Sequence, residues 1–441
     1  KTAYEIVSRD WSSDVCSSDL LRDRAPLPVD PRSIDVVILT HAHIDHSGYL
    51  PLLVKCGFHG PVYCSSATRD LCEILLPDSA HLQEEEAQYA NRKGFSKHHP
   101  ALPLYTRADA DAALRLLKPV AFGHALKLGG DLSFVLDPSG HILGSSLVTL
   151  RAEGRTIVFS GDLGRPDDPI MHAPAALDSA DYLVIESTYG DRLHATSDPM
   201  AELAAVLNRT FARGGIAVIP AFAVDRTEVL LFHLRRLADD GQLPPMPIHV
   251  DSPMALAALR IYREAMEQHA EDVKEELHDA GELFDLPSLH EVLDADASKE
   301  VSAASGPAII IAGAGMASGG RVVHHLKRFL PDPANSVALV GFQAVGTRGR
   351  SLLEGATTVK IHGEYVRVRA EICDLTGFSV HADSDELVRW IRSAGRAPRS
   401  VFVVHGEPQA AEALRARIEE ELDWTAVVPD MGERIILETR A

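Results

Sequence analysis

Several features that define other protein classes are scarce in this 441-residue chain. Its five cysteines include no Cys-x-x-Cys pair, which argues against both a disulfide framework and a structural zinc knuckle. The longest apolar runs, such as residues 307–316, are too short to cross a bilayer, and the N-terminus has no secretory signal pattern. We therefore expect a cytoplasmic protein that does not interact with membranes.

Positive charge is also scarce. Lys and Arg total 43 against 63 Asp and Glu, a net charge of -20, so no overall basic field attracts nucleic acid. A polyanionic partner would have to be held by a local patch or by metal ions. What is present is ordinary globular composition, with 46% hydrophobic and 24% charged residues, and enough length for two or three domains. Histidine is the outlier, with 21 residues against nine tyrosines and three tryptophans.

Residues 1–20 differ from the rest of the chain. Ser-Ser-Asp-Val-Cys is followed by the near-repeat Ser-Ser-Asp-Leu, without helical or strand periodicity. Residues 10–20 resemble a translated sequencing adapter, so we expect this segment to be foreign. A polar leader without regular structure is the alternative.

The pattern of elements predicts one domain inserted into another. The run 34–40 is continuously apolar and β-branched, which indicates a strand buried on both faces. Strands at 132–136, 146–151, 156–160 and 182–186 follow, and Glu153-Gly154 is expected to turn an antiparallel pair. From about residue 197, helices and strands alternate as in a parallel α/β unit, and short strands return after about residue 359. We expect the outer domain at 21–195 and 359–441, with the insertion at 196–358.

The strongest chemical signal is the hexapeptide that follows the first strand, with His41, His43, Asp45 and His46. In extended backbone, the i and i+2 histidines lie on one side, and the following turn brings the other two side chains to a second position nearby. Three imidazoles and a carboxylate in six residues suit a pair of zinc-class ions. One hexapeptide cannot fill two metal sites. Three later residues at strand ends, beside small residues and glycines, are the candidates to complete them: His141, Asp162 and His405.

In this order, the motifs resemble those of the metallo-β-lactamase fold. Glu186 in IESTYGD, His381 in GFSVHAD and His405 in VVHGE further resemble the β-CASP subfamily of nucleic-acid-processing enzymes, specifically bacterial RNases related to RNase J and the pre-mRNA 3′-end cleavage nuclease. The resemblance implies an αββα sandwich with an inserted parallel α/β β-CASP cap domain.

The resemblance also implies roles for these residues. One zinc ion would be held by His41, His43 and His141, and a second by Asp45, His46 and His405, with Asp162 bridging. His381 would be the general acid that protonates the leaving oxygen, oriented by Glu186, and Asp45 counts as both a ligand and a catalytic residue. The expected activity is hydrolysis of RNA phosphodiester bonds by a two-zinc ribonuclease, endonucleolytic, 5′-exonucleolytic or both. The oligomeric state is open, with a homodimer among the expectations.

One departure from the family pattern leaves two alternatives. The family begins with further strands and an aspartate that anchors the metal-binding loop, and neither Asp30 nor Asp35 is a convincing substitute. A catalytically weakened nuclease subunit is one alternative. The other is a small-molecule hydrolase of the same fold, such as a thioesterase or lactonase. The inserted domain and the Glu186/His381 pair favour the nuclease, because acyl hydrolysis needs neither.

A glycine-rich segment, IIIAGAGMASGG, covers residues 309–320 and precedes Arg321. Its spacing is not that of the dinucleotide fingerprint, and close helix packing would explain the glycines as well. Because backbone amides at such a turn can bind phosphate, we expect RNA contacts from Ser318, Gly319 and Arg321. Arg348, in a local basic turn, is a further candidate.

Overall fold

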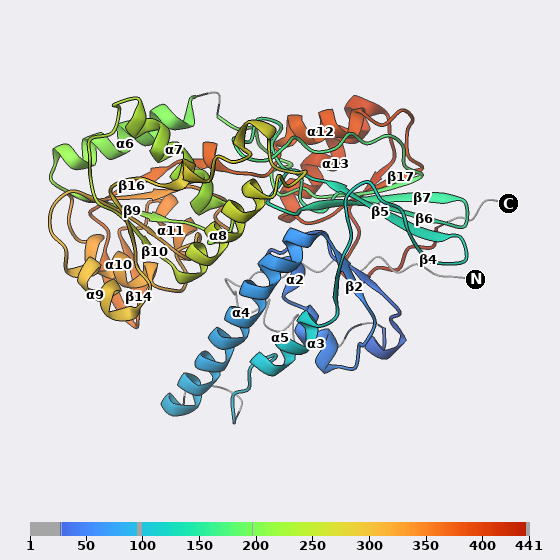
Figure 1. The fold of residues 1–441 in the computed structure, drawn as a ribbon, viewed down its shortest axis with the longest axis horizontal. Helices are drawn as coiled ribbons and strands as arrows, with labels where there is room; N and C mark the ends of the chain where they lie inside the picture. The colour runs from blue at the N-terminus through green and yellow to red at the C-terminus, as the bar shows by residue number, and fades with distance from the viewer. Residues whose placement is uncertain (1–26, 28, 95–98, 196, 438–441) are drawn as a thin grey trace. The chain divides into compact units, whose positions relative to one another are not determined.

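The computed structural model describes residues 27, 29–94, 99–195 and 197–437, which fall into two compact units (Figure 1). The first unit contains the described residues up to Leu193 and those from His381 onward, and the second contains His194–Val380. One unit is therefore inserted into the other along the chain. The expected foreign segment at residues 1–20 lies outside the described residues.

The first unit contains a small parallel sheet in the order β1-β2-β3. Its strands are β1 (Val37–Ile38), β2 (Val62–Cys64) and β3 (Leu117–Pro119). Its helices are α2 (Ile44–Ser47), α3 (Leu50–Lys55), α4 (Ser66–Lys93) and α5 (Arg107–Leu114), and the 3-10 turn η1 spans Pro31–Ser33. The strand predicted at 34–40 is thus only two residues long and half-buried, which corrects the expectation of burial on both faces. The reason is that, within the described residues, β1 is an edge strand that pairs only with β2.

A seven-stranded mixed sheet forms the larger layer of this unit, in the order β18-β17-β8-β7-β6-β5-β4. Its strands are β4 (Leu126–Gly129), β5 (Leu132–Pro138), β6 (Ser146–Ala152), β7 (Arg155–Phe159), β8 (Tyr182–Ile185), β17 (Ser400–Val403) and β18 (Ala426–Val427). Strands β4 to β7 pair antiparallel, and the remaining pairs are parallel. Glu153 and Gly154 have positive φ and join β6 to β7, as predicted for a tight hairpin.

The two faces of the large sheet bury different partners, as strand alternation requires. Leu183 and Val401 face helices α12 (Ser384–Arg392) and α13 (Pro408–Leu422), which contribute Leu387 and Leu414 to the same core. On the other face, Phe134 and its neighbours pack with Ile38 and Tyr63 of the small sheet. The first unit is therefore the expected sandwich of two sheets with helices outside.

The second unit is built on a six-stranded, all-parallel sheet in the order β11-β10-β12-β9-β13-β16. Its strands are β9 (Ile216–Pro220), β10 (Ile248–Asp251), β11 (Leu289–Glu291), β12 (Ala308–Ala312), β13 (Ser336–Leu339) and β16 (Glu371–Asp374). Its helices are α6 (Pro199–Ala212), α7 (Arg226–Asp239), α8 (Pro253–Glu267), α9 (Ala295–Ala303), α10 (Val322–Phe329) and α11 (Arg348–Leu353). Short 3-10 turns are η2 (Glu275–Leu277), η3 (Gly281–Phe284) and η4 (Thr376–Phe378). The predicted parallel α/β unit is confirmed, and the loops that follow its strands leave from one edge.

The second unit ends later in the chain than the boundary expected at residue 358. An antiparallel hairpin comes next, formed by β14 (Thr358–Ile361) and β15 (Glu364–Arg367). It places Val359, Ile361 and Val366 in the core of the second unit, and β16 then joins its sheet beside β13. Residues up to Val380 consequently pack with the second unit. In the described part of the chain, no helix is long and apolar enough to span a membrane.

Candidate metal centre

The histidine-rich hexapeptide lies at the end of β1, where the chain turns from extended backbone into helix. His43 has φ -50° and ψ 146° and precedes α2, so Asp45 and His46 lie in the first helical turn. His41 is completely buried. The motif thus presents two histidines before the turn and two side chains after it, as the spacing predicts.

The other three predicted ligands come from the ends of β5, β7 and β17 in the large sheet. His141 follows Gly140, which has a φ of 68°, a conformation that favours glycine. A side chain on Gly140 would also lie only 2.5 Å from the His172 carbonyl. Asp162 follows Gly161, which also has positive φ. His405 itself has a φ of 52°, which is uncommon for a residue with a side chain. These turns place the three side chains close to those of the hexapeptide.

All seven predicted ligands come together in two adjoining groups. His41, His43, His141 and Asp162 offer ligand atoms that lie within 4.8 Å of one another, and so do Asp45, His46 and His405. Asp162 faces both groups. Its Oδ2 lies 3.5 Å from Nε2 of His41 and of His141. Its Oδ1 lies 3.3 Å from Nε2 of His46 and 3.2 Å from Nδ1 of His405. The structure therefore brings the seven side chains together in two groups that could each hold a metal ion, with Asp162 close to both.

Several donor side chains favour the protonation state that a metal ion requires, whereas, although burial opposes this, Asp162 and Asp45 raise the pKa of His46. Burial lowers the pKa of His41 and of His141 well below the ordinary value and that of His43 to about 4, so these imidazoles are neutral near pH 7. Although burial opposes ionisation, nearby His46 and His405 lower the pKa of Asp45 to about 2.

Two buried atoms of the cluster also lack hydrogen-bond partners among the described residues: His41 Nε2 and His141 Nδ1. Buried polar atoms are normally paired, so the unpaired ones fit cations as their partners. Five imidazoles and two carboxylates match zinc-class ions.

Glu186 and His381 lie beside this cluster. Glu186 follows β8 and is buried, and its Oε1 lies 3.3 Å from Nδ1 of His381. The same oxygen accepts a hydrogen bond from the backbone N–H of Leu163 at 2.6 Å, and Oε2 accepts one from Thr188 at 3.3 Å. The His381 ring centroid is 4.4 Å from that of His141. Although burial favours the neutral ring, the charge and hydrogen bond of Glu186 raise the pKa of His381.

Sequence reasoning did not identify the groups that orient these side chains. Thr40 Oγ1 lies 3.2 Å from Nδ1 of His41, and Thr188 Oγ1 lies 3.4 Å from Nδ1 of His405. Such partners fix the ring orientation of metal-ligating histidines. The position of Thr40 directly before His41 was a usable signal, whereas a backbone donor such as Leu163 leaves no trace in residue identity.

Three domain families match this chain. The Beta-lactamase superfamily domain matches residues 12–215, the Beta-Casp domain matches 227–352, and the Zn-dependent metallo-hydrolase RNA specificity domain matches 365–429. Ribonuclease TTHA0252 of Thermus thermophilus is 38% identical over 394 residues, which cover 89% of this chain and 86% of that protein. The chain belongs to the metallo-β-lactamase/β-CASP ribonuclease family.

The chain is also similar to archaeal proteins at lower sequence identity. Transcription termination factor FttA is 32% identical in Pyrococcus abyssi and 31% identical in Pyrococcus horikoshii, in each case over 417 residues. The match covers 92% of this chain but 62% of each of those proteins. Membership of the family confirms the predicted fold class and the predicted class of enzyme, a zinc-dependent hydrolase.

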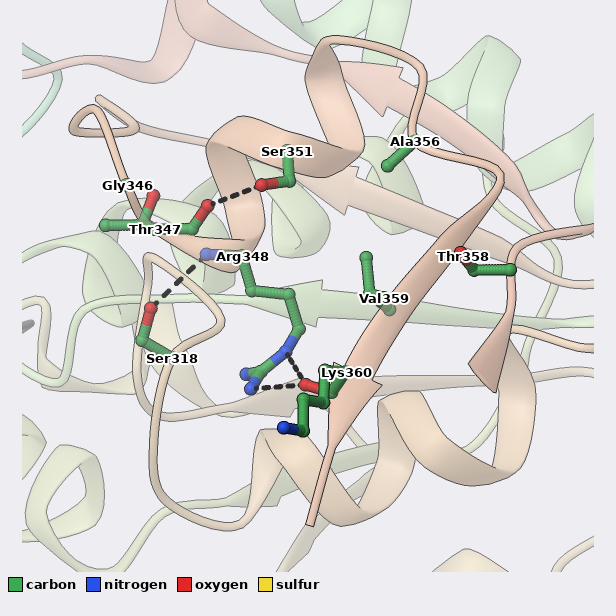
Figure 2. Close-up of a pocket in the computed structure, with 9 residues that line it drawn as sticks. All are labelled: Ser318, Gly346, Thr347, Arg348, Ser351, Ala356, Thr358, Val359 and Lys360. Atoms are coloured by element: carbon green, nitrogen blue, oxygen red, sulfur yellow. Dashed lines mark hydrogen bonds between the residues drawn. The ribbon is translucent and has the colours of Figure 1, made fainter. Parts of the chain in front are cut away.

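The expected substrate contacts lie in the second unit. Ser318 and Arg348 line an open pocket of about 370 Å³, together with residues of α11 and β14 (Figure 2). Gly319 lies in open space, since a side chain there would meet no atom within 4 Å. Arg321 instead points inward, and its guanidinium donates to buried Asp251 at 2.7 Å. Contact of these four residues with RNA remains a prediction.

Proposed function

We propose that this β-CASP protein is a two-zinc ribonuclease that hydrolyses RNA phosphodiester bonds, by endonucleolytic or 5′-exonucleolytic cleavage, in RNA processing or decay. The observation that carries the proposal is the pair of donor groups joined by Asp162 with the Glu186–His381 pair beside them. The expected homodimer and cytoplasmic location remain predictions.

The residues divide the work as follows. His41, His43 and His141 would hold one ion, Asp45, His46 and His405 the other, and Asp162 would bridge them. When bound, the ions supply a hydroxide near neutral pH and offset negative charge that develops on the phosphoryl oxygens. The intact donor set argues against a weakened subunit.

His381 is the proposed general acid. Its Nδ1 faces Glu186, and we assign the proton given to the leaving ribose oxygen to the other ring nitrogen, Nε2. Glu186 is held by two backbone N–H groups, so it orients the ring and favours its protonated form.

The test measures bound metal and cleavage of three RNAs: 5′-monophosphorylated, 5′-triphosphorylated and circular. We expect chelator-sensitive cleavage by the wild type and its loss in Asp162→Asn. Asp167→Asn is the matched control, since Asp167 is an exposed aspartate of the same loop.

Cleavage of circular RNA would establish endonuclease activity, because an exonuclease needs an end. Zinc-loaded protein that cleaves no RNA but hydrolyses thioesters or lactones would replace the proposal with the small-molecule alternative.

A further inference from the structure

The glycine-rich segment of the second unit forms a loop, Gly313–Gly320, between β12 and α10. It leaves the carboxyl edge of the parallel sheet, where open α/β sheets bind ligands. At its start, the Gly313 carbonyl accepts a hydrogen bond from the Val322 N–H at 3.2 Å, and a side chain on Gly313 would lie 3.1 Å from Ser252 Oγ. The two ends of the loop are thus closed against each other and against the turn after β10.

Buried Asp251 anchors the C-terminal end of the loop. Its Oδ1 accepts from Arg321 at 2.7 Å, while Oδ2 lies 2.7 Å from Nε2 of His325 and accepts from Ser298 Oγ at 2.5 Å. Although burial opposes ionisation, hydrogen bonds from His325, Ser298 and Arg321 hold the pKa of Asp251 below its ordinary value.

The same arginine makes two further bonds inside the unit. Its guanidinium donates to the backbone carbonyls of Val292 at 3.0 Å and Leu293 at 3.1 Å. Arg321 is therefore fixed by three internal acceptors at the point where the loop enters α10.

The middle of the loop is held from the other side, by Gln343 after β13 and by the first two residues of α11. Three consecutive loop carbonyls each accept a hydrogen bond from these residues. Gly315 accepts from Gln343 Nε2 at 3.1 Å, Met316 accepts from the Gly349 N–H at 3.0 Å, and Ala317 accepts from the Arg348 guanidinium.

Arg348 connects this loop to the neighbouring strand. Its Nη2 and Nε donate to the Lys360 carbonyl of β14 at 3.1 and 3.3 Å, as the dashed lines in Figure 2 show. One side chain therefore joins the glycine-rich loop and β14. A lysine ammonium is a compact point charge on a flexible stem and lacks the planar fork with which Arg348 reaches both carbonyls.

At the tip of the loop, Ser318 Oγ donates to the Met316 carbonyl at 3.3 Å and accepts from the Arg348 N–H at 3.5 Å. A side chain on Gly320 would lie 2.9 Å from the Gly313 carbonyl, so Gly319 is the tip residue with open space beside it. A side chain on Gly315 would meet the Phe222 ring at 2.6 Å, whereas one on Gly319 would meet no atom within 4 Å. Ser318 also lines the open pocket described above, and none of the described residues that line that pocket is acidic. The loop thus combines a rigid base with an open, uncharged backbone tip.

We propose that Asp251, Arg321 and Arg348 are positioning residues that hold the glycine-rich loop rigid, so that its tip around Gly319 contacts RNA phosphates through backbone N–H groups. The inference rests on the proposed RNA substrate. It replaces the expectation that Arg321 and Arg348 contact RNA directly.

Salt dependence separates positioning from direct contact. A cation that neutralises a phosphate releases counterions, which contributes about 0.7 to the slope of log affinity against log salt for single-stranded nucleic acid. Loss of a positioning arginine weakens binding through the backbone tip and leaves this slope unchanged.

The experiment uses the zinc-loaded full chain with KM and kcat for RNA measured at several KCl concentrations. We expect Arg348→Gln and Arg348→Lys to raise KM about tenfold each, with kcat within twofold of wild type and an unchanged salt slope. Rescue by lysine, or a slope reduced by about 0.7, would show direct phosphate contact and overturn the proposal.

Two further variants keep the proposal testable if an arginine variant fails to fold. Gly319→Val fills the open space at the tip, so we expect KM to rise at least tenfold at wild-type thermal stability. Gly395→Ala, where a side chain would make only one ordinary contact at 3.5 Å, is the control. An unchanged KM in Gly319→Val would refute contact at the tip. Wild-type protein that does not cleave RNA would instead refute the proposed function.

Discussion

Removal of the metal ions is expected to destabilise the first unit strongly. Two buried atoms, His41 Nε2 and His141 Nδ1, lack hydrogen-bond partners among the described residues. An unsatisfied buried polar atom costs about 1–3 kcal/mol, so the two together cost roughly 2–6 kcal/mol when no ion is bound. Whole domains are stable by only about 5–15 kcal/mol, so this cost is a large share of the total.

The assay is thermal unfolding of zinc-loaded and chelator-treated protein at pH 7.5, with metal content measured on the same samples. For a unit of this size, about 1 kcal/mol corresponds to about 2–4 °C, so we expect the first unit to melt at least about 4 °C lower without metal. Asp162→Asn should shrink the difference, because the variant loses the carboxylate that faces both donor groups. Asp167→Asn should behave as wild type.

Equal melting temperatures in samples with confirmed loss of zinc would refute the reasoning. That result would mean that the buried donor atoms are satisfied without a cation. The second unit provides an internal reference, because its stability should not respond to the chelator.

Three further predictions concern single residues. His381→Ala should retain metal but lose about 10²–10⁴-fold in kcat on RNA, the usual contribution of a general acid, and undiminished turnover would exclude that role. Glu186→Gln removes the charge that raises the pKa of His381, so the alkaline limb of the kcat–pH profile should move to lower pH; an unshifted limb would contradict the pairing. Gly140→Ala places a methyl group 2.5 Å from the His172 carbonyl at a residue with positive φ. Chemical denaturation should therefore show a free energy of unfolding that is lower by about 1–3 kcal/mol, and a decrease below about 0.5 kcal/mol would count against the tight turn.

The convergence of the seven candidate ligands could be predicted because each of them carries a local signature. The hexapeptide from His41 to His46 is dense in donors, and His141, Asp162 and His405 each follow a strand beside a small residue or glycine. The strand before the motif was predicted less well. Its apolar composition favours burial on both faces, but burial depends on which strands pair beside it, and within the described residues β1 has one neighbour.

Long-range pairings limited the rest of the prediction. Arg321 follows a glycine-rich turn and was expected to face substrate, yet its acceptor Asp251 lies 70 residues earlier in the chain. The insertion boundary failed for a similar reason. Short strands after residue 358 look like a return to the outer domain, but β16 pairs in parallel with β13 of the second unit. Such partners are set by tertiary packing, which neither residue type nor periodicity reveals.

The insertion of one unit into the other also determines when during synthesis the candidate active site is completed. The proposed general acid His381 is translated 195 residues after Glu186, the carboxylate beside it. At about 5–20 residues per second, a ribosome needs roughly 10–40 s to make that stretch. Throughout that interval the emerging chain carries the histidine hexapeptide but neither His381 nor His405. A nascent β-CASP ribonuclease therefore cannot assemble its full site while its own messenger is still being read through the second unit.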